Sequence, residues 1–360
     1  MPQGKKHMSE INVKSAEEHT WDDLLRIRPL AAHLAGVTDD ANWLELTAEL
    51  LTGGKSNLTF LLCSPAGEMI LRRPPTGNLL PSAHNMAREA RIQRAVAGTG
   101  VPVAHIVTES PSDDLIGAPF YVMEKVVGHI ICDVLPDGYA TKPTERAGLA
   151  HALIDTLASL HAVNADEAGL EGYGRPEGFV ARQVERWYGQ WAASRTHEVP
   201  AVDQLAALLG DNVPSESGHS IVLGDFRLDN CLMDLDDANK VTAVLDWELS
   251  TLGDPLTDLG LMMFFWQEPG EMSPILTPGV TALAGFPTRN DLIERYAAAS
   301  GLDVSTLPFY TALAHLKFAV VVQGVSARAA SGAMAGQDFG DLDAEVSRIA
   351  RDGLAIARSL

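Results

Sequence analysis

The chain has 360 residues, and its 27 lysine and arginine residues against 47 aspartate and glutamate residues give a formal net charge of −20. Hydrophobic residues make up 46% of the chain and charged residues 21%, which is typical of a folded globular protein and excludes wholesale disorder. The acidic excess argues against a broad electrostatic surface for nucleic acid or for an anionic membrane.

The cysteine pattern and the apolar runs bear on the cellular compartment. Cys63, Cys132 and Cys231 lie far apart and form no CxxC pair, so we expect neither a disulfide framework nor a structural zinc site. The first residues are basic without an apolar segment behind them, and the longest apolar run, residues 259–266, is too short to span a bilayer. We therefore predict a cytoplasmic protein with no nucleic-acid or membrane partner.

The first part of the chain predicts an extension followed by a small lobe. Residues 1–40 are polar and partly helix-like, and we treat them as an N-terminal extension. Residues 41–127 contain a glycine turn at Gly53-Gly54 and several strand-like runs, which predict an antiparallel meander with one helix. The expected strands lie before the glycine turn and at residues 58–63, 69–72, 101–107 and 119–127, and the helix is expected from Ser82 to Ala97.

Beyond Gly128 the pattern becomes mostly helical. Two short β-like runs interrupt it, at residues 220–223 and 241–245. We therefore predict an α+β, two-lobe fold, in which a small antiparallel-sheet lobe (residues 41–127) joins a larger, mostly helical lobe (residues 128–360). Helices are expected at residues 145–161, 179–191, 292–299, 308–330 and 342–360, with one more beginning near Asp258.

Two polar motifs carry the strongest chemical signal. The first is GDFRLDN at residues 224–230, and the second is VLDWE at residues 244–248, where a β-like run ends. Phosphoryl transfer from ATP requires a carboxylate to orient the attacking hydroxyl and a cation to neutralise the developing charge. Asp225 can supply that carboxylate, and Arg227 can supply that cation.

The same motifs offer ligands for a divalent metal. Asn230 lies five residues after Asp225, and Asp246 ends the following β-like run. Their hard oxygen atoms suit magnesium (Mg) better than zinc. A D-x-x-x-x-N spacing alone occurs by chance, but together with the downstream aspartate and the glycine-turn lobe it predicts an ATP- and magnesium-dependent phosphotransferase.

The chain resembles the aminoglycoside phosphotransferase and choline kinase family, which has a protein-kinase-like fold. More narrowly, it resembles the branch that is fused to acyl-CoA dehydrogenases or encoded as stand-alone bacterial proteins. The resemblance covers about residues 44–258, and the helical tail to Arg328 also fits. It rests on GGKSNLTF (residues 53–60), LRRPP (71–75), Arg88-Glu89, GDFRLDN (224–230) and LDWELSTLGDP (245–255).

The resemblance implies roles for individual residues. Asp225 would be the catalytic aspartate, Asn230 and Asp246 would bind magnesium, and Glu89 would pair with Arg72 on the ATP phosphates. Arg73 is a rival for the role of Arg72, because neighbouring strand residues face opposite sides. Gly53, Gly54, Ser56 and Asn57 would cover the ATP phosphates, and the backbone of the hinge residues Glu124 and Val126 would hold adenine.

Several alternatives stay open at this stage. GGKS is not a P-loop, because Glu49 stands where that motif needs glycine, but it could be a hairpin turn without a ligand. The family usually has histidine where this chain has Leu223, so a nucleotide-binding pseudokinase with a regulatory or scaffolding role is the alternative function. GTP in place of ATP and a homodimer are also open.

The acceptor is expected to be a hydroxyl of a small molecule. Net acidity favours a cationic aminoglycoside, whereas the branch resemblance favours a hydroxyacyl group carried as a CoA thioester. A choline-type kinase would need an aromatic cage, which Trp247 and the helix from Trp187 to Trp191 could provide.

Overall fold

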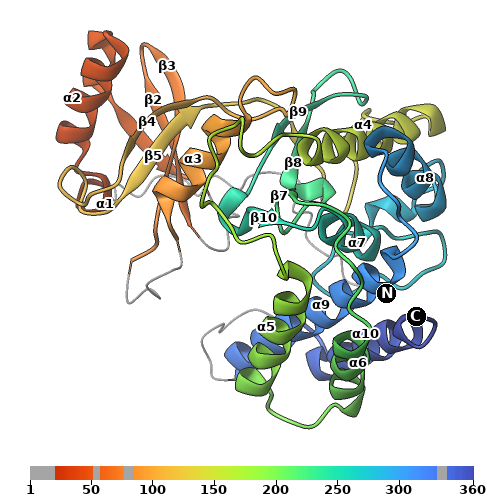
Figure 1. The fold of residues 1–360 in the computed structure, drawn as a ribbon. Helices are drawn as coiled ribbons and strands as arrows, with labels where there is room; N and C mark the ends of the chain where they lie inside the picture. The colour runs from red at the N-terminus through yellow and green to blue at the C-terminus, as the bar shows by residue number, and fades with distance from the viewer. Residues whose placement is uncertain (1–20, 52–56, 77–83, 331–338) are drawn as a thin grey trace, which may run out of the picture. The chain divides into compact units, whose positions relative to one another are not determined.

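The computed structural model describes residues 21–51, 57–76, 84–330 and 339–360 (Figure 1). The chain forms two compact units. Unit 1 consists of Met1–Gly128 and Thr242–Glu248, and unit 2 consists of His129–Val241 and Leu249–Leu360. The glycine turn at residues 53–54 and the expected helix start at Ser82 lie outside the described residues.

Unit 1 is built on one antiparallel sheet of five strands, as the sequence predicts (Figure 1). The strands pair in the order β1-β2-β3-β5-β4, so β5 is inserted between β3 and β4. In this register Leu71 lies opposite both Phe60 and Val122. The strands are β1 (Thr47–Leu50), β2 (Leu58–Ser64), β3 (Gly67–Arg73), β4 (Ile106–Ser110) and β5 (Phe120–Glu124).

One face of this sheet is covered by α1 (Asp22–Leu25) and α2 (Ile27–Thr38). Leu25, Leu30 and Leu34 are fully buried in the cluster that also contains Phe60, Leu71 and Val122 of the sheet. The short 3-10 helix η1 (Ala41–Glu45) follows and adds buried Trp43. The predicted N-terminal extension therefore contributes to the core of unit 1, because its apolar residues pack on the sheet.

The other face of the sheet carries α3 (Met86–Val96). The helix begins after Asn85, whose side chain accepts a hydrogen bond from the Arg88 N–H, and packs its Met86 and Ala90 on Ile106 and Tyr121. Side chains alternate between the two faces along each strand. Residues at even and odd positions of β3 therefore face α3 and α2 respectively, which decides what each of its two arginines contacts.

Unit 2 is mostly helical. It contains one helix that the sequence analysis missed, α6 (Pro200–Asp211), which has proline at its first position, where the missing N–H costs no hydrogen bond. Its other helices are α4 (Pro143–His161), α5 (Phe179–Ser194), α7 (Leu256–Phe265), α8 (Arg289–Ser300), α9 (Leu307–Ala330) and α10 (Leu342–Ala357), with 3-10 turns η2 (Leu228–Asn230), η3 (Trp247–Leu249) and η4 (Val280–Ala282).

Short strands join the helices of unit 2. Strand β6 (His129–Ile130) pairs with β8 (Cys231–Met233), and β7 (Ser220–Val222) pairs with β10 (Thr251–Gly253). Strand β9 (Val241–Val244) leads the chain from unit 2 into unit 1.

The segment after β9 differs from the sequence-based division of the chain. Residues 128–360 were assigned together to the helical lobe, but Thr242–Glu248 belongs to unit 1. The Val244 N–H donates to the Pro102 carbonyl at 2.8 Å, and the Thr242 hydroxyl donates to the Val127 carbonyl at 3.3 Å. These bonds tie the segment that carries Asp246 to unit 1.

Helix α9 is the central helix of unit 2 and packs against α5, α6, α7 and α10. It is long and apolar enough to cross a membrane by length and composition, but 67% of its apolar window is buried inside the protein. Packing against four helices explains a continuous apolar surface of this kind.

The contact between α7 and α9 predicts the effect of one substitution. An alanine Cβ at Gly260 would lie 2.6 Å from the backbone carbon of Tyr310, which cannot move without shifting α9. We expect Gly260→Ala to lower the free energy of unfolding by about 1–3 kcal/mol, measured by urea denaturation. Gly189→Ala on α5 is the matched control, because nothing lies within 4 Å of its Cβ, and it should raise stability by about 0.5–1 kcal/mol. Equal effects at the two sites would contradict the close packing of α7 on α9.

Candidate active site

Arg72 on β3 is the centre of a charged cluster in unit 1. Its guanidinium lies 3.6 Å from Glu89 Oε2 on α3 and 3.5 Å from Asp246 Oδ1. Its Nε is buried and has no hydrogen-bond partner among the described residues, so the guanidinium still has a donor to offer an anion. Burial alone would lower the pKa of Arg72, but the Tyr121 hydroxyl and the surrounding carboxylates raise it above its ordinary value.

Arg73 does not share this position. Its side chain points to the opposite face of the sheet and donates to the carbonyls of Leu24 and Pro74. Because side chains alternate along β3, Arg72 and not Arg73 faces Glu89 and forms the expected ion pair with it.

Glu89 is almost completely buried, at 2% exposure. Its carboxylate accepts hydrogen bonds from Asn57 Nδ2 at 2.9 Å and from the Tyr121 hydroxyl at 3.0 Å. Burial raises the pKa of Glu89 to about 7, although the neighbouring Arg72 opposes this shift. The carboxylate therefore depends on Arg72 and its two donors to remain ionised.

Asp246 lies two residues after the end of β9 and adopts a left-handed backbone conformation, with φ of 59°. A non-glycine residue rarely adopts this conformation unless the surrounding structure holds it there, and such residues cluster at functional sites. The side chain of Asp246 is 37% exposed, so one edge of its carboxylate faces Arg72 and the rest is open to a ligand.

The other residues predicted to bind nucleotide fall into two groups. Gly53, Gly54 and Ser56 lie outside the described residues. The side chain of Asn57 contacts Glu89, Glu248 at 3.3 Å and His84 at 2.7 Å, so it braces the charged cluster and any contact to phosphate would come from its backbone.

The predicted hinge follows the end of β5. The Glu124 N–H donates to the His105 carbonyl at 2.9 Å, so Glu124 could reach adenine only through its own carbonyl. Val126 lies two residues further on and is partly buried. Their adenine contacts stay a prediction.

In unit 2, residues 223–230, here called the Asp225 loop, follow β7. Gly224 has φ of 84°, and an added Cβ would lie 3.0 Å from Leu249 Cβ and 3.1 Å from the Leu249 carbonyl oxygen. Both the backbone conformation and the close approach of Leu249 therefore require glycine immediately before Asp225.

Asp258 on α7 holds the start of this loop. It is fully buried, and its carboxylate accepts hydrogen bonds from the Leu223 N–H at 2.6 Å and from the Gly224 N–H at 2.8 Å. His161 Nε2 lies 3.5 Å from the same carboxylate, and His161 Nδ1 lies 2.6 Å from the Tyr296 hydroxyl. Asp258 therefore braces the loop from the first turn of α7, which begins at Leu256, two residues before the helix start expected near Asp258.

Asp225 is oriented by two other residues of its loop. Asn230 Nδ2 donates to the Asp225 carbonyl at 2.8 Å and to Asp225 Oδ2 at 3.0 Å. Arg227 Nε lies 3.4 Å from the same Oδ2 and 3.2 Å from Asp229 Oδ1. Because both contacts to the Asp225 carboxylate go to Oδ2, Oδ1 is the oxygen of Asp225 that can accept a hydrogen bond from a substrate.

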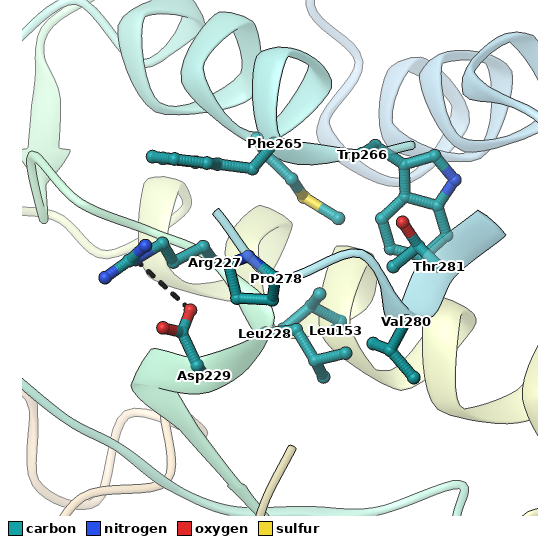
Figure 2. A pocket seen from close by; sticks show the side chains of 10 residues that line it. Leu153, Arg227, Leu228, Asp229, Phe265, Trp266, Pro278, Val280 and Thr281 are labelled. Carbon is teal, nitrogen blue, oxygen red and sulfur yellow. Dashed lines mark ion pairs between the residues drawn. The ribbon is translucent and has the colours of Figure 1, made fainter. Parts of the chain in front are cut away.

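Figure 2 shows the surroundings of Arg227, whose guanidinium lies over the ring of Phe265 at 4.9 Å and pairs with Asp229. These residues border a small cavity, of about 20 Å³, which is room for roughly one water molecule. Leu153, Leu228, Met262, Trp266, Pro278, Val280 and Thr281 line the rest of it. The side chains that line the cavity pack against the loop, and the cavity is too small to hold a substrate.

One residue next to Asp225, Lys317, was not predicted from the sequence. Lys317 on α9 is partly buried, and its ammonium group donates to the Gly224 carbonyl and lies 5.5 Å from the ring centre of Trp187. The sequence does mark Lys317 as unusual, because it is the only Asp, Glu, Lys or Arg between Leu307 and Ala327. A single charge in an apolar helix needs a buried partner, but the pattern does not show which one.

Each unit offers an oxygen atom that suits a magnesium ion. With Nδ2 of Asn230 bound to Asp225, the amide oxygen of Asn230 points away from that bond and can bind a cation. Asp246 offers an exposed carboxylate oxygen. No cluster of three or more His, Cys, Asp or Glu side chains suited to a metal occurs within the described residues.

The buried carboxylate of Glu89 predicts how stability depends on pH. Because its pKa rises from 4.5 to about 7 on folding, it contributes stability that is complete below pH 4.5 and is lost as the pH rises through 7. We expect the stability of the wild type to fall by about 3 kcal/mol between these pH values and Glu89→Gln to abolish this fall, measured by denaturant unfolding without nucleotide or metal. Glu68→Gln, at an exposed carboxylate on the same sheet, is the control, and an unchanged pH slope in Glu89→Gln would contradict the assignment.

The geometry agrees with what comparison to known proteins shows. A family model described as the phosphotransferase enzyme family matches residues 47–292. Acyl-CoA dehydrogenase family member 11 of Homo sapiens is 35% identical over 345 residues, which cover 95% of this chain and 44% of that protein. The chain therefore spans less than half the length of this relative.

Solved structures extend the comparison. A Ralstonia eutropha protein, provisionally described as an aminoglycoside phosphotransferase, is 33% identical with a TM-score of 0.76, covering 87% of this chain and 93% of that one. A choline kinase from Cryptosporidium parvum shares the fold, with 12% identity, a TM-score of 0.59 and coverage of 88% and 90%. The predicted protein-kinase-like α+β fold and the resemblance to the branch fused to acyl-CoA dehydrogenases are both confirmed. The chain belongs to the phosphotransferase enzyme family of small-molecule kinases.

Proposed function

We propose that the protein transfers the terminal phosphoryl group of ATP to a hydroxyl of a small molecule in a magnesium-dependent reaction. The observation that carries the proposal is the Asp225 loop, in which Asn230 and Arg227 both contact Oδ2 of Asp225 and Asp258 holds the backbone. The two contacts to Oδ2 orient the carboxylate and leave Oδ1 available to orient an attacking hydroxyl.

The roles of the individual residues follow from their contacts. Asp225 orients the acceptor hydroxyl and takes its proton as the new O–P bond forms, while the bond between the γ-phosphorus and the bridging oxygen breaks and ADP leaves. Arg227 lies beside Asp225 and neutralises charge on the moving phosphoryl group, and Arg72 offers its buried Nε and its charge to the ATP phosphates. Magnesium, bound through Asn230 and Asp246, would neutralise the phosphate oxygens. A structural neighbour with 15% identity and a TM-score of 0.58, an aminoglycoside phosphotransferase, is solved with ADP and hygromycin B, which supports a nucleotide substrate here.

The charges near Asp225 bear on the acceptor. Lys317, Arg186 and Arg227 interact electrostatically around this site, although the chain as a whole carries −20. The carboxylates of Asp225 and Asp258 lie among these cations, so the local charges alone do not select between a cationic and an anionic acceptor. Trp191 and Trp247 are also buried, so they cannot form an aromatic cage at a surface. We propose a hydroxyacyl acceptor carried as a CoA thioester, and the support for it is the 35% identity to acyl-CoA dehydrogenase family member 11.

Leu223 does not by itself favour a pseudokinase. The loop backbone is held by Asp258 through the N–H groups of Leu223 and Gly224, and these bonds do not involve the side chain at position 223. The regulatory alternative predicts binding of MgATP without transfer, so turnover distinguishes it from a kinase.

The test is phosphoryl transfer from labelled ATP in the presence of magnesium, with short and long hydroxyacyl-CoAs, aminoglycosides and choline as acceptors. We expect transfer to a hydroxyacyl-CoA, and a loss of about 10²- to 10⁴-fold in kcat for Asp225→Asn, which removes the proton acceptor. Asp236→Asn, at an exposed loop position of unit 2, is the matched control and should be as active as the wild type.

A binding measurement separates chemistry from metal binding. Asp246→Asn should lose magnesium-dependent ATP binding by calorimetry, whereas Asp225→Asn should keep it. MgATP binding by the wild type without transfer to any acceptor would support the pseudokinase alternative and refute the proposed reaction.

A further inference from the structure

The contact between Lys317 and the Asp225 loop has a specific geometry. The ammonium group of Lys317 donates to the Gly224 carbonyl. That carbonyl belongs to the peptide group whose nitrogen is the backbone nitrogen of Asp225. A hydrogen bond to this oxygen therefore restricts rotation of the peptide plane from which Asp225 projects.

This bond complements the two that Asp258 makes. Asp258 binds the N–H groups of Leu223 and Gly224, which fixes the two peptide groups before Gly224. Lys317 binds the peptide group after it. Because glycine has wide rotational freedom, Gly224 would be a pivot if only one side were held. An anion on α7 and a cation on α9 thus hold the two sides of this pivot.

The surroundings of Lys317 keep its ammonium group in place. Trp187 on α5 lies 5.5 Å from Nζ, a distance at which an indole ring attracts a cation, and Arg186 lies 5.4 Å from the same ring. Burial lowers the pKa of Lys317, the carboxylates of Asp225 and Asp258 raise it, and Arg186 and Arg227 lower it further. The two carboxylates are the groups that favour the charged ammonium.

We propose that Lys317 is a positioning residue for Asp225, which acts by holding the Gly224–Asp225 peptide group in the orientation that phosphoryl transfer requires. The proposal rests on the proposed function for its kinetic consequence, but its structural part does not. Lys317 touches neither acceptor nor nucleotide in this role, so its loss changes the rate of the chemical step and not the affinity for ATP.

The kinetic test replaces Lys317 by methionine, which keeps the apolar stem but cannot donate. We expect Lys317→Met to lower kcat by about 10- to 100-fold, with the KM for MgATP within about two-fold of the wild type. Lys317→Arg keeps a charged donor and should recover part of the lost rate. Val321→Met, at a partly exposed position one turn along α9, is the matched control and should leave kcat unchanged.

A second variant covers the case in which Lys317→Met does not fold. Lys317→Ala leaves room for a small amine, and added ethylammonium should restore kcat, whereas ethanol at the same concentration should not. A wild-type kcat in Lys317→Met, or equal recovery with ethylammonium and ethanol, would overturn the proposal.

A measurement without turnover separates this proposal from the proposed function. Hydrogen exchange of the peptide covering residues 221–230 should be faster in Lys317→Met than in the wild type or Val321→Met. Faster exchange in Lys317→Met together with an absence of transfer in the wild type would contradict the proposed reaction but support the positioning contact. Unchanged exchange would overturn the positioning role, whether or not the protein is a kinase.

Discussion

The buried carboxylate of Asp258 is the interaction on which the candidate active site of unit 2 depends. It accepts hydrogen bonds from two consecutive backbone N–H groups immediately before Asp225, and it lies near His161, whose ring contacts Tyr296. A buried carboxylate without donors would cost several kcal/mol, so the carboxylate and the loop stabilise each other. Because α7 is packed tightly on α9 at Gly260, the position of Asp258 is in turn set by the helical core of unit 2.

A second buried charge organises unit 1. Arg72 lies among Glu89, Asp246 and the Tyr121 hydroxyl, and the pKa of Glu89 rises to about 7 because burial outweighs the attraction of the arginine. Such a cluster is costly unless its members are fully paired, and here the buried Nε of Arg72 has no partner among the described residues. A site for the phosphates of ATP would meet this requirement, since phosphate oxygens supply the acceptors that the guanidinium lacks.

Whether a feature was predicted from the sequence depended on whether its pattern is local or needs a packing partner from elsewhere in the chain. The strands β2 and β3 were readable because their apolar runs are separated by turn residues, and the alternation of side chains separates Arg72 from Arg73 once one face of β3 is known. Helix α6 was missed, and α1 and α2 were assigned to an extension, because their apolar residues are recognisable as core only when the surface that they cover is known. The segment that carries Asp246 was assigned to the helical lobe because chain order does not show that Val244 and Thr242 bond to residues of unit 1.

The sequence by itself determined the chemistry that this protein can offer, because the spacing from Asp225 to Asn230, the later Asp246 and the strand arginines predict hard oxygen ligands and cations suited to phosphate. These are local patterns, and residue type and spacing are sufficient to recognise them. Only the tertiary structure decided which groups hold those residues in place. Asp258 and Lys317 lie 33 and 92 positions after Asp225, and neither has a sequence signature that points to the loop. Their role depends on how α7 and α9 pack, because a hydrogen bond to the backbone can come from any part of the chain that the fold brings within reach.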